Sequence, residues 1–114
     1  MYDNIFDNLA INLHKIAVEK GFWGSPEDGD AIDDIFVAKQ CMMIVSEVTE
    51  VMEAVRKNKG EEEITKEFAD IIIRTLDLYA GMVEAGYTKL SLDQALREKV
   101  EFNKTRPEKH GVRF

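Results

Sequence analysis

Two pairs of carboxylates are the residues of this sequence best suited to chemistry. Glu47 and Glu50 are three positions apart, as are Glu67 and Asp70, so within helices the members of each pair share a face. Four carboxylates around one small volume repel one another and need a cation between them. Oxygen ligands in this number suit Mg²⁺, with Mn²⁺ as a substitute. The spacing therefore predicts a divalent-metal site, provided that the two helices pack antiparallel.

The same carboxylates have a simpler interpretation, which is a solvated acidic face on a bundle helix. Acidic pairs at this spacing are only slightly more frequent than chance in so acidic a chain. The residues around both pairs are nevertheless apolar on several sides, which is unusual for a surface that faces only solvent; they include Ile44, Val45, Val48, Phe68 and Ile71. Both interpretations stay open at this point.

Motifs for other chemistry are missing from the sequence. It contains no Glu-x-x-His, no His-Glu-x-x-His, no Cys-x-x-Cys and no glycine-rich phosphate loop. We expect His14 to lie at the surface or its boundary and not to be a metal ligand. Cys41, the only cysteine, lies in an apolar run, so we expect a buried and inert thiol.

Four helices must position these residues. Apolar residues recur at three- and four-residue spacing over 3–20, 33–58, 61–84 and 91–104. Ser91 opens the last of these segments with a capping-box sequence. An acidic, glycine-rich loop over 21–30 carries Trp23, the only tryptophan, and a basic, irregular tail covers 105–114. Because no segment alternates with period two, the sequence predicts an all-α fold in a single domain, 1–114.

The two long helices are apolar over a wide arc. Three consecutive isoleucines, 71–73, spread apolar side chains over about 200° of a helix. A lone bundle needs only a narrow stripe, so we expect a second subunit to cover part of this surface in a homodimer or homotetramer. The core stripes expected on these helices include Val48, Met52, Val55, Phe68 and Ile72.

Charge and hydropathy exclude several classes of partner. Among 114 residues there are 15 basic and 22 acidic ones, for a net charge of −7, which argues against a nucleic-acid polymer. The longest apolar run, 41–45, is far shorter than the roughly 20 residues that a membrane span needs. The N-terminus has no signal-peptide pattern. We therefore expect a cytoplasmic protein without a membrane partner.

Three segments carry a resemblance to a known family. Residues 46–54, a spacer and then 67–70 resemble the Glu-x-x-Glu, spacer, Glu-x-x-Asp pattern of the MazG family of all-α nucleoside triphosphate pyrophosphohydrolases. The ending 98–111 is similar to small MazG-like proteins of bacteria and phages, and the similarity covers roughly 35–114. The resemblance implies a four-helix MazG-like bundle completed by oligomerisation. It also implies Mg²⁺-dependent hydrolysis of a nucleoside triphosphate to monophosphate and pyrophosphate, which would clean or control a nucleotide pool.

The resemblance assigns roles to individual residues. The positions that match the family's Mg²⁺ ligands are Glu47, Glu50, Glu67 and Asp70. Glu47 or Glu50 would orient or deprotonate the attacking water. Lys99 and Asn103 match positions that contact the nucleotide, and their four-residue spacing lets both face one site.

Other residues are candidates for substrate contacts, each with a structural alternative. Lys39, two turns before Glu47 on the same face, reaches the phosphates or base, or is a surface lysine. Trp23 stacks on a base, or packs its loop against the bundle. Arg106 and Lys109 touch phosphate, or simply make the tail basic. Glu53 and Asp77 are secondary candidates. Asp77 orients Arg74 or a ligand, or else forms a surface ion pair.

A second hypothesis needs no chemistry. The chain would be a non-enzymatic helical interaction module, and its solvated acidic faces would keep it in solution. The two hypotheses differ in one structural requirement, since the enzyme needs its carboxylates clustered.

Overall fold

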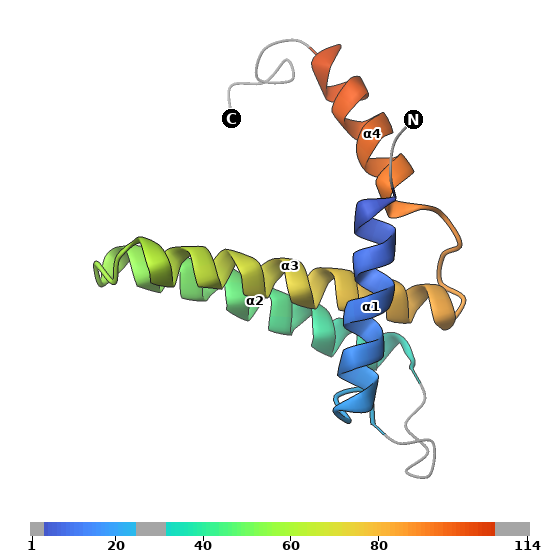
Figure 1. Cartoon of the computed structure of the whole chain (residues 1–114), viewed down its shortest axis with the longest axis horizontal. Helices are drawn as coiled ribbons and strands as arrows, with labels where there is room; N and C mark the ends of the chain where they lie inside the picture. The colour runs from blue at the N-terminus through green and yellow to red at the C-terminus, as the bar shows by residue number, and fades with distance from the viewer. Residues whose placement is uncertain (1–3, 25–31, 107–114) are drawn as a thin grey trace.

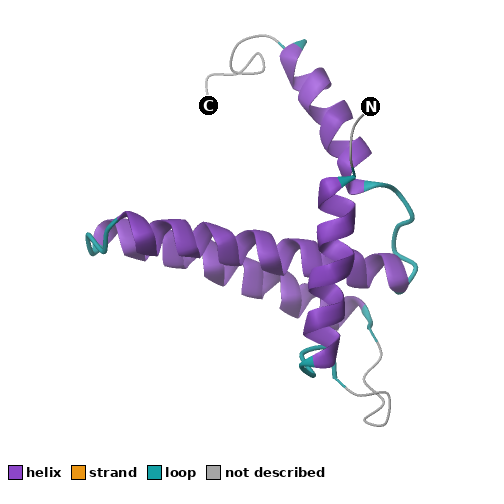
Figure 2. Cartoon of the chain, viewed as in Figure 1, coloured by secondary structure: helices purple, strands orange, loops and turns teal. Residues whose placement is uncertain are grey.

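All secondary structure in the described part of the chain is helical. The computed structural model describes residues 4–24 and 32–106, with helices α1 (Ile5–Glu19), α2 (Asp34–Arg56), α3 (Glu61–Glu84) and α4 (Leu92–Lys104) (Figure 2). The all-α prediction is confirmed, and each predicted helix end lies within two residues of the observed one. None of the described helices combines the length and the apolarity needed to cross a bilayer. The predictions for residues 25–30 and 107–114 lie outside the described residues.

The ends of α2 are set by local interactions. Asp33 caps the N-terminus, where its side chain accepts a hydrogen bond from the backbone N–H of Phe36 at 2.8 Å. After the helix, Asn58 and Gly60 take positive φ angles of 56° and 95°, which asparagine and glycine tolerate best. The resulting short turn reverses the chain, so α2 and α3 are antiparallel, as the metal-site prediction requires.

α2 and α3 form a helical hairpin, and α1 and α4 extend from it. α2 and α3 lie side by side as the long hairpin, and α1 crosses α3 in the half far from the hairpin turn (Figure 1). α4 begins beside the N-terminal end of α1 and points away from the hairpin (Figure 1). In the described part of the chain, α4 packs against α1 and has no backbone neighbour on α2 or α3. The four helices therefore do not close into a bundle within one chain.

The buried core is small and consists mainly of alanines. The buried hydrophobic residues are Ala10, Ala17, Ala54, Leu76, Leu78 and Ala80. The expected core stripes are confirmed only in part for a single chain. Leu76 on the α3 stripe is buried, but Phe68 is 53% exposed. Val48 and Met52 on α2 are 46% and 63% exposed, because within the described residues α2 has only α3 as a helix neighbour. Cys41 is exposed on the same helix, so the prediction of a buried thiol is also wrong.

One copy of the chain leaves an unusually large surface in water. Its accessible surface is 9016 Å², against about 6,300 Å² for a compact protein of its mass. Its radius of gyration is 16.8 Å, against about 13 Å for a compact domain of this length. Large hydrophobic side chains contribute to this surface, among them Ile35, Met42 and Phe102, which are 80%, 64% and 54% exposed.

The N-terminal ends of α1 and α4 meet and cap each other. Asp93 is buried and accepts hydrogen bonds from the backbone N–H groups of Phe6, at 3.1 Å, and Asp7, at 2.7 Å. Asp7 in turn accepts from the N–H of Leu92 at 2.8 Å and from the hydroxyl of Ser91 at 2.5 Å. Each carboxylate thus satisfies free N–H groups in the first turn of the other helix, where the helix dipole favours negative charge. This reciprocal capping sets the direction of α4.

Replacing Asp7 by asparagine tests this junction. Burial acts to raise the pKa of Asp7, but hydrogen bonds from Ser91, Leu92 and Asp93 outweigh it and hold the pKa below the ordinary value of 3.8. A carboxyl whose pKa falls on folding stabilises the protein above its unfolded pKa, and this contribution is lost as the pH falls through the folded pKa. We expect Asp7→Asn to lower the free energy of unfolding by about 1–2 kcal/mol near neutral pH.

Thermal melts over a pH series provide the measurement. The difference between wild type and Asp7→Asn should shrink once the pH falls below 3.8. Glu101→Gln is the matched control, because Glu101 is an exposed acid on α4. Equal effects of the two variants at neutral pH would contradict the capping role.

Candidate functional site

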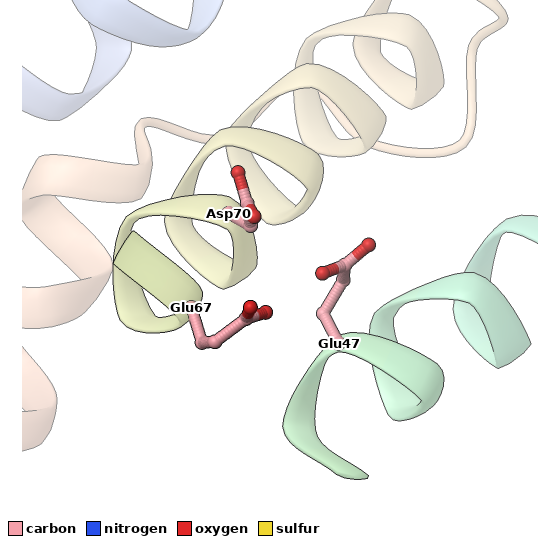
Figure 3. Close-up of side chains that lie close together, drawn as sticks. All are labelled: Glu47, Glu67 and Asp70. Carbon is pink, nitrogen blue, oxygen red and sulfur yellow. The ribbon is translucent and has the colours of Figure 1, made fainter. Parts of the chain in front are cut away.

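The antiparallel hairpin brings three of the four predicted carboxylates together. Glu47 on α2 and Glu67 and Asp70 on α3 each offer an oxygen, and these three oxygens lie within 4.8 Å of one another (Figure 3). The side chains of Glu47 and Glu67 extend into the space between the two helices (Figure 3). Glu50 is exposed and lies outside this three-oxygen group.

Negative charge gathers around Glu67, one member of this group. The pKa of Glu67 lies above its ordinary 4.5, because of partial desolvation, a hydrogen bond with Glu63, and the nearby negative charges of Asp70 and Glu50. Glu50 is therefore close enough to act on the group electrostatically. Each of these causes disfavours the ionised form of Glu67, so a cation placed between the oxygens would be attracted.

The donor set fits a hard divalent cation. All three side chains present carboxylate oxygens, the ligands that Mg²⁺ and Mn²⁺ prefer. Mg²⁺ is usually held by a few carboxylates together with water and substrate phosphates, so three donors leave room for a substrate. Exposed acids also gather at such distances without a metal. The group is thus suitable for Mg²⁺ or Mn²⁺.

A cavity of about 530 Å³ lies beside the carboxylates, between α1, α2 and α3. Its size is within the usual range of small-molecule sites. Glu47 and Asp70 line it together with Lys39, Arg74 and Trp23. The structure therefore places two of the predicted substrate contacts, Lys39 and Trp23, in the same cavity as two of the predicted metal ligands.

The remaining predicted substrate contacts lie elsewhere in this chain. Lys99 and Asn103 are exposed on α4, and Arg106 follows it. The charged groups of Lys99 and Arg106 each lie 5.4 Å from the centre of the Phe102 ring. Since α4 has no backbone neighbour on the hairpin among the described residues, a single chain leaves Lys99, Asn103 and Arg106 away from the carboxylates. Lys109 lies outside the described residues.

A partly buried hydrogen-bond cluster around His14 fixes Trp23 against the helices. His14 is only 4% exposed, so its predicted surface position is wrong. Its Nδ1 lies 2.8 Å from an Asp77 oxygen and its Nε2 lies 3.1 Å from Glu84. The indole N–H of Trp23 donates to the same Asp77 oxygen at 2.8 Å, and the two rings meet edge to face at 4.5 Å. Asp77 thus anchors the segment after α1 at the cavity wall.

Gly81 leaves the space that the Trp23 ring occupies. A Cβ added at Gly81 would lie 2.2 Å from Cη2 of the indole, far inside contact distance. In an open helix position, Gly→Ala stabilises the folded protein by up to about 1 kcal/mol. With the Trp23 ring in place, the same substitution should instead destabilise it. We expect Gly81→Ala to lower the melting temperature and to red-shift the emission of the only tryptophan.

The double variant Gly81→Ala, Trp23→Ala separates the clash from helix propensity. Without the indole, the alanine should be neutral or stabilising relative to Trp23→Ala alone. An unchanged emission spectrum in the single variant would contradict the packing of Trp23 against α3.

Arg74 is the site residue that the sequence indicated least clearly. Its Nε donates to a Glu47 oxygen at 2.8 Å, with the side chains 39% and 16% exposed. Sequence reasoning considered Arg74 only as a partner for Asp77. Its position four residues after Asp70 was the available signal, because that spacing places both on one face of α3.

Comparisons of this chain with protein-family models, curated proteins and solved structures find no match. The resemblance to the MazG family therefore rests on the two carboxylate motifs and on the 98–111 ending, which contains Lys99 and Asn103.

Proposed function

We propose that this protein is a Mg²⁺-dependent nucleoside triphosphate pyrophosphohydrolase, acting on a cytoplasmic nucleotide pool. Water would attack at phosphorus and break the anhydride bond between the α- and β-phosphates, releasing a nucleoside monophosphate and pyrophosphate. The observation that supports this proposal is the convergence of carboxylates from both motifs, Glu47 with Glu67 and Asp70, beside a cavity that also contains Lys39.

The roles of the residues follow from their positions. Glu47, Glu67 and Asp70 would hold the metal. When bound, Mg²⁺ supplies charge to offset the phosphates and to promote ionisation of water. Glu50 lies outside the three-oxygen group, so it would be free to accept the proton of the attacking water while Glu47 holds the metal.

Substrate contacts would come from the cavity wall. Lys39 offers its ammonium group to the phosphates, which a chain of net charge −7 would otherwise repel. Trp23 lines the cavity and is held by Asp77, so it would form a fixed part of the wall that the base meets. Phe22 lines the same cavity and is 73% exposed, which leaves its face free for stacking.

We propose that the working form is a homodimer or homotetramer in which α4 of a second copy completes the site. Two apolar surfaces support this assembly: α4 exposes Val100 and Phe102 at 50% and 54%, and the hairpin exposes Met52 and Phe68. Lys99 on α4 and Arg106 just after it offer positive charge to the acidic group on the hairpin, while Glu98 and Glu101 on the same helix offset part of that charge. Docking of the partner's α4 beside the acidic group would bring Lys99, Asn103 and Arg106 toward the carboxylates.

The alternative function is a non-enzymatic helical interaction module. The observation that favours it is the extent of exposed apolar surface, which a protein partner would also cover. In that case the carboxylates are only a solvated face.

Thermal unfolding separates the two functions. A nucleotide hydrolase gains stability when Mg²⁺ and a triphosphate bind its folded state, and the gain rises with ligand concentration. We expect melting temperatures to increase with both ligands together and less with either alone. An interaction module would respond to neither, and melting curves that superimpose under all conditions would refute the enzyme proposal.

A further inference from the structure

The guanidinium of Arg74 occupies the position of a counter-ion within the acidic group. It contacts Glu47 at 2.8 Å, and Glu47 is the ligand that α2 contributes to the three-oxygen group. Asp70, on the same face of α3, contributes another of the three oxygens. A metal ion and Arg74 would therefore both draw on the negative charge of Glu47.

Stabilisation of the fold is a weak explanation for this pair. The Arg74 side chain is 39% exposed, so solvent weakens what the pair with the less exposed Glu47 adds to stability, and α2 and α3 are already joined by a short turn. The pair also places a cation beside oxygens that a metal would need. Its position is better explained if the arginine takes part in binding.

The geometry leaves most of the guanidinium available. Only Nε is hydrogen-bonded to Glu47, and within residues 4–24 and 32–106 the two terminal nitrogens have no hydrogen-bond partner. The side chain lines the cavity that also contains Lys39, and it is 39% exposed. Arginine presents a planar fork of donors that matches phosphate oxygens in a bidentate way.

We propose that Arg74 is an exchangeable counter-ion, which neutralises Glu47 when no metal is bound and binds substrate phosphate when metal has replaced it. This inference rests on the proposed function, since it assumes the metal and the polyphosphate. It adds that metal and phosphate binding are coupled through one side chain. Metal binding frees the guanidinium, and phosphate then keeps it away from Glu47, so each ligand tightens the other.

The test measures binding without turnover. Mn²⁺ affinity is measured by electron paramagnetic resonance on the nucleotide-free protein, and affinity for inorganic pyrophosphate is measured by calorimetry with Mn²⁺ present. In Arg74→Ala, Mn²⁺ should bind about tenfold more tightly because its competitor is gone, and pyrophosphate about tenfold more weakly because a charged donor is gone. Arg74→Lys should keep near-native Mn²⁺ affinity but lose part of the pyrophosphate affinity, since it lacks the fork.

Two controls isolate the effect of this pair. Arg56→Ala removes an arginine that pairs with Glu53 on the hairpin, away from the cavity lining. Lys39→Ala removes the other cation of the cavity and reports the general effect of lost positive charge. Arg74→Ala should tighten Mn²⁺ binding more than either control does.

The outcomes distinguish this inference from the proposed function. If wild type binds Mn²⁺ through a site that Asp70→Asn removes, but Arg74→Ala changes Mn²⁺ affinity no more than Arg56→Ala, the counter-ion role is wrong and the metal site stands. Unchanged pyrophosphate affinity in Arg74→Ala would refute the phosphate role. If wild type binds neither probe, the proposed function fails and the role of Arg74 fails with it.

Discussion

Asp70→Asn is expected to reduce Mg²⁺-dependent turnover by more than about a hundredfold, since even changes to the outer shell of a metal site cost 10–100-fold. Asp70 is one of the three residues whose oxygens converge, and the amide removes a charged ligand while keeping the shape of the side chain. Helical content should not change, because Asp70 is exposed and forms no part of the core. Rates of pyrophosphate release and circular dichroism provide the measurements.

Glu67→Gln is a second test of the metal site, because turnover should be lost while the stability of the fold is kept or raised. The pKa of Glu67 is raised by desolvation, by its hydrogen bond with Glu63 and by neighbouring negative charge. A neutral side chain relieves the repulsion, so the metal-free variant should melt no lower than wild type while turnover is lost. Glu50→Gln should also abolish turnover, through the loss of water activation.

The matched control for these variants is Glu62→Gln. Glu62 is an exposed acid in the first turn of α3 and is absent from the three-oxygen group. It should leave turnover unchanged. Turnover retained in Asp70→Asn would contradict the metal assignment and favour the solvated acidic face.

Two inactive variants should restore activity when their subunits are mixed. In the proposed assembly, Asp70 of one copy and Lys99 of another belong to the same site. Dimers of Asp70→Asn lack the metal site, and dimers of Lys99→Ala lack the nucleotide contact. A mixed dimer contains one site with both residues intact, so random mixing should recover about one quarter of wild-type activity.

The experiment requires refolding the two variants together and separately. It should be run at low substrate concentration, where the loss of the Lys99 contact is most visible. Mixing Asp70→Asn with Glu67→Gln is the control, because both residues lie on α3 and no mixed dimer has an intact site. The arrangement is contradicted if the Asp70→Asn and Lys99→Ala mixture recovers no more activity than this control.

Local signals in the sequence predicted the elements and part of the site. The helix periodicity and the Asn58 and Gly60 positions predict two helices with a break between them, and leave their antiparallel packing as a condition of the metal site. The structure meets this condition, which places Glu47 opposite Glu67 and Asp70. The i, i+3 spacing does not distinguish Glu50 from Glu47, Glu67 and Asp70. Which carboxylates join the three-oxygen group depends on how far each side chain points toward the neighbouring helix.

Contacts between distant segments could not be predicted in this way. The direction of α4 depends on Asp7 and Asp93, whose reciprocal capping joins positions far apart in the sequence. His14 was misplaced because its burial depends on Asp77 and Trp23, which satisfy and cover the ring. Periodicity identifies the apolar faces of the helices, but it does not show which part of the protein or which partner covers each face.

The most direct test of the proposed function is pyrophosphate release from a panel of canonical and modified nucleoside triphosphates, with and without Mg²⁺. We predict metal-dependent release of pyrophosphate and the matching monophosphate from one or a few members of the panel, and none from Asp70→Asn. A folded protein that releases no pyrophosphate from any member, in Mg²⁺ or Mn²⁺, would contradict the proposal and leave the helical interaction module as the better account.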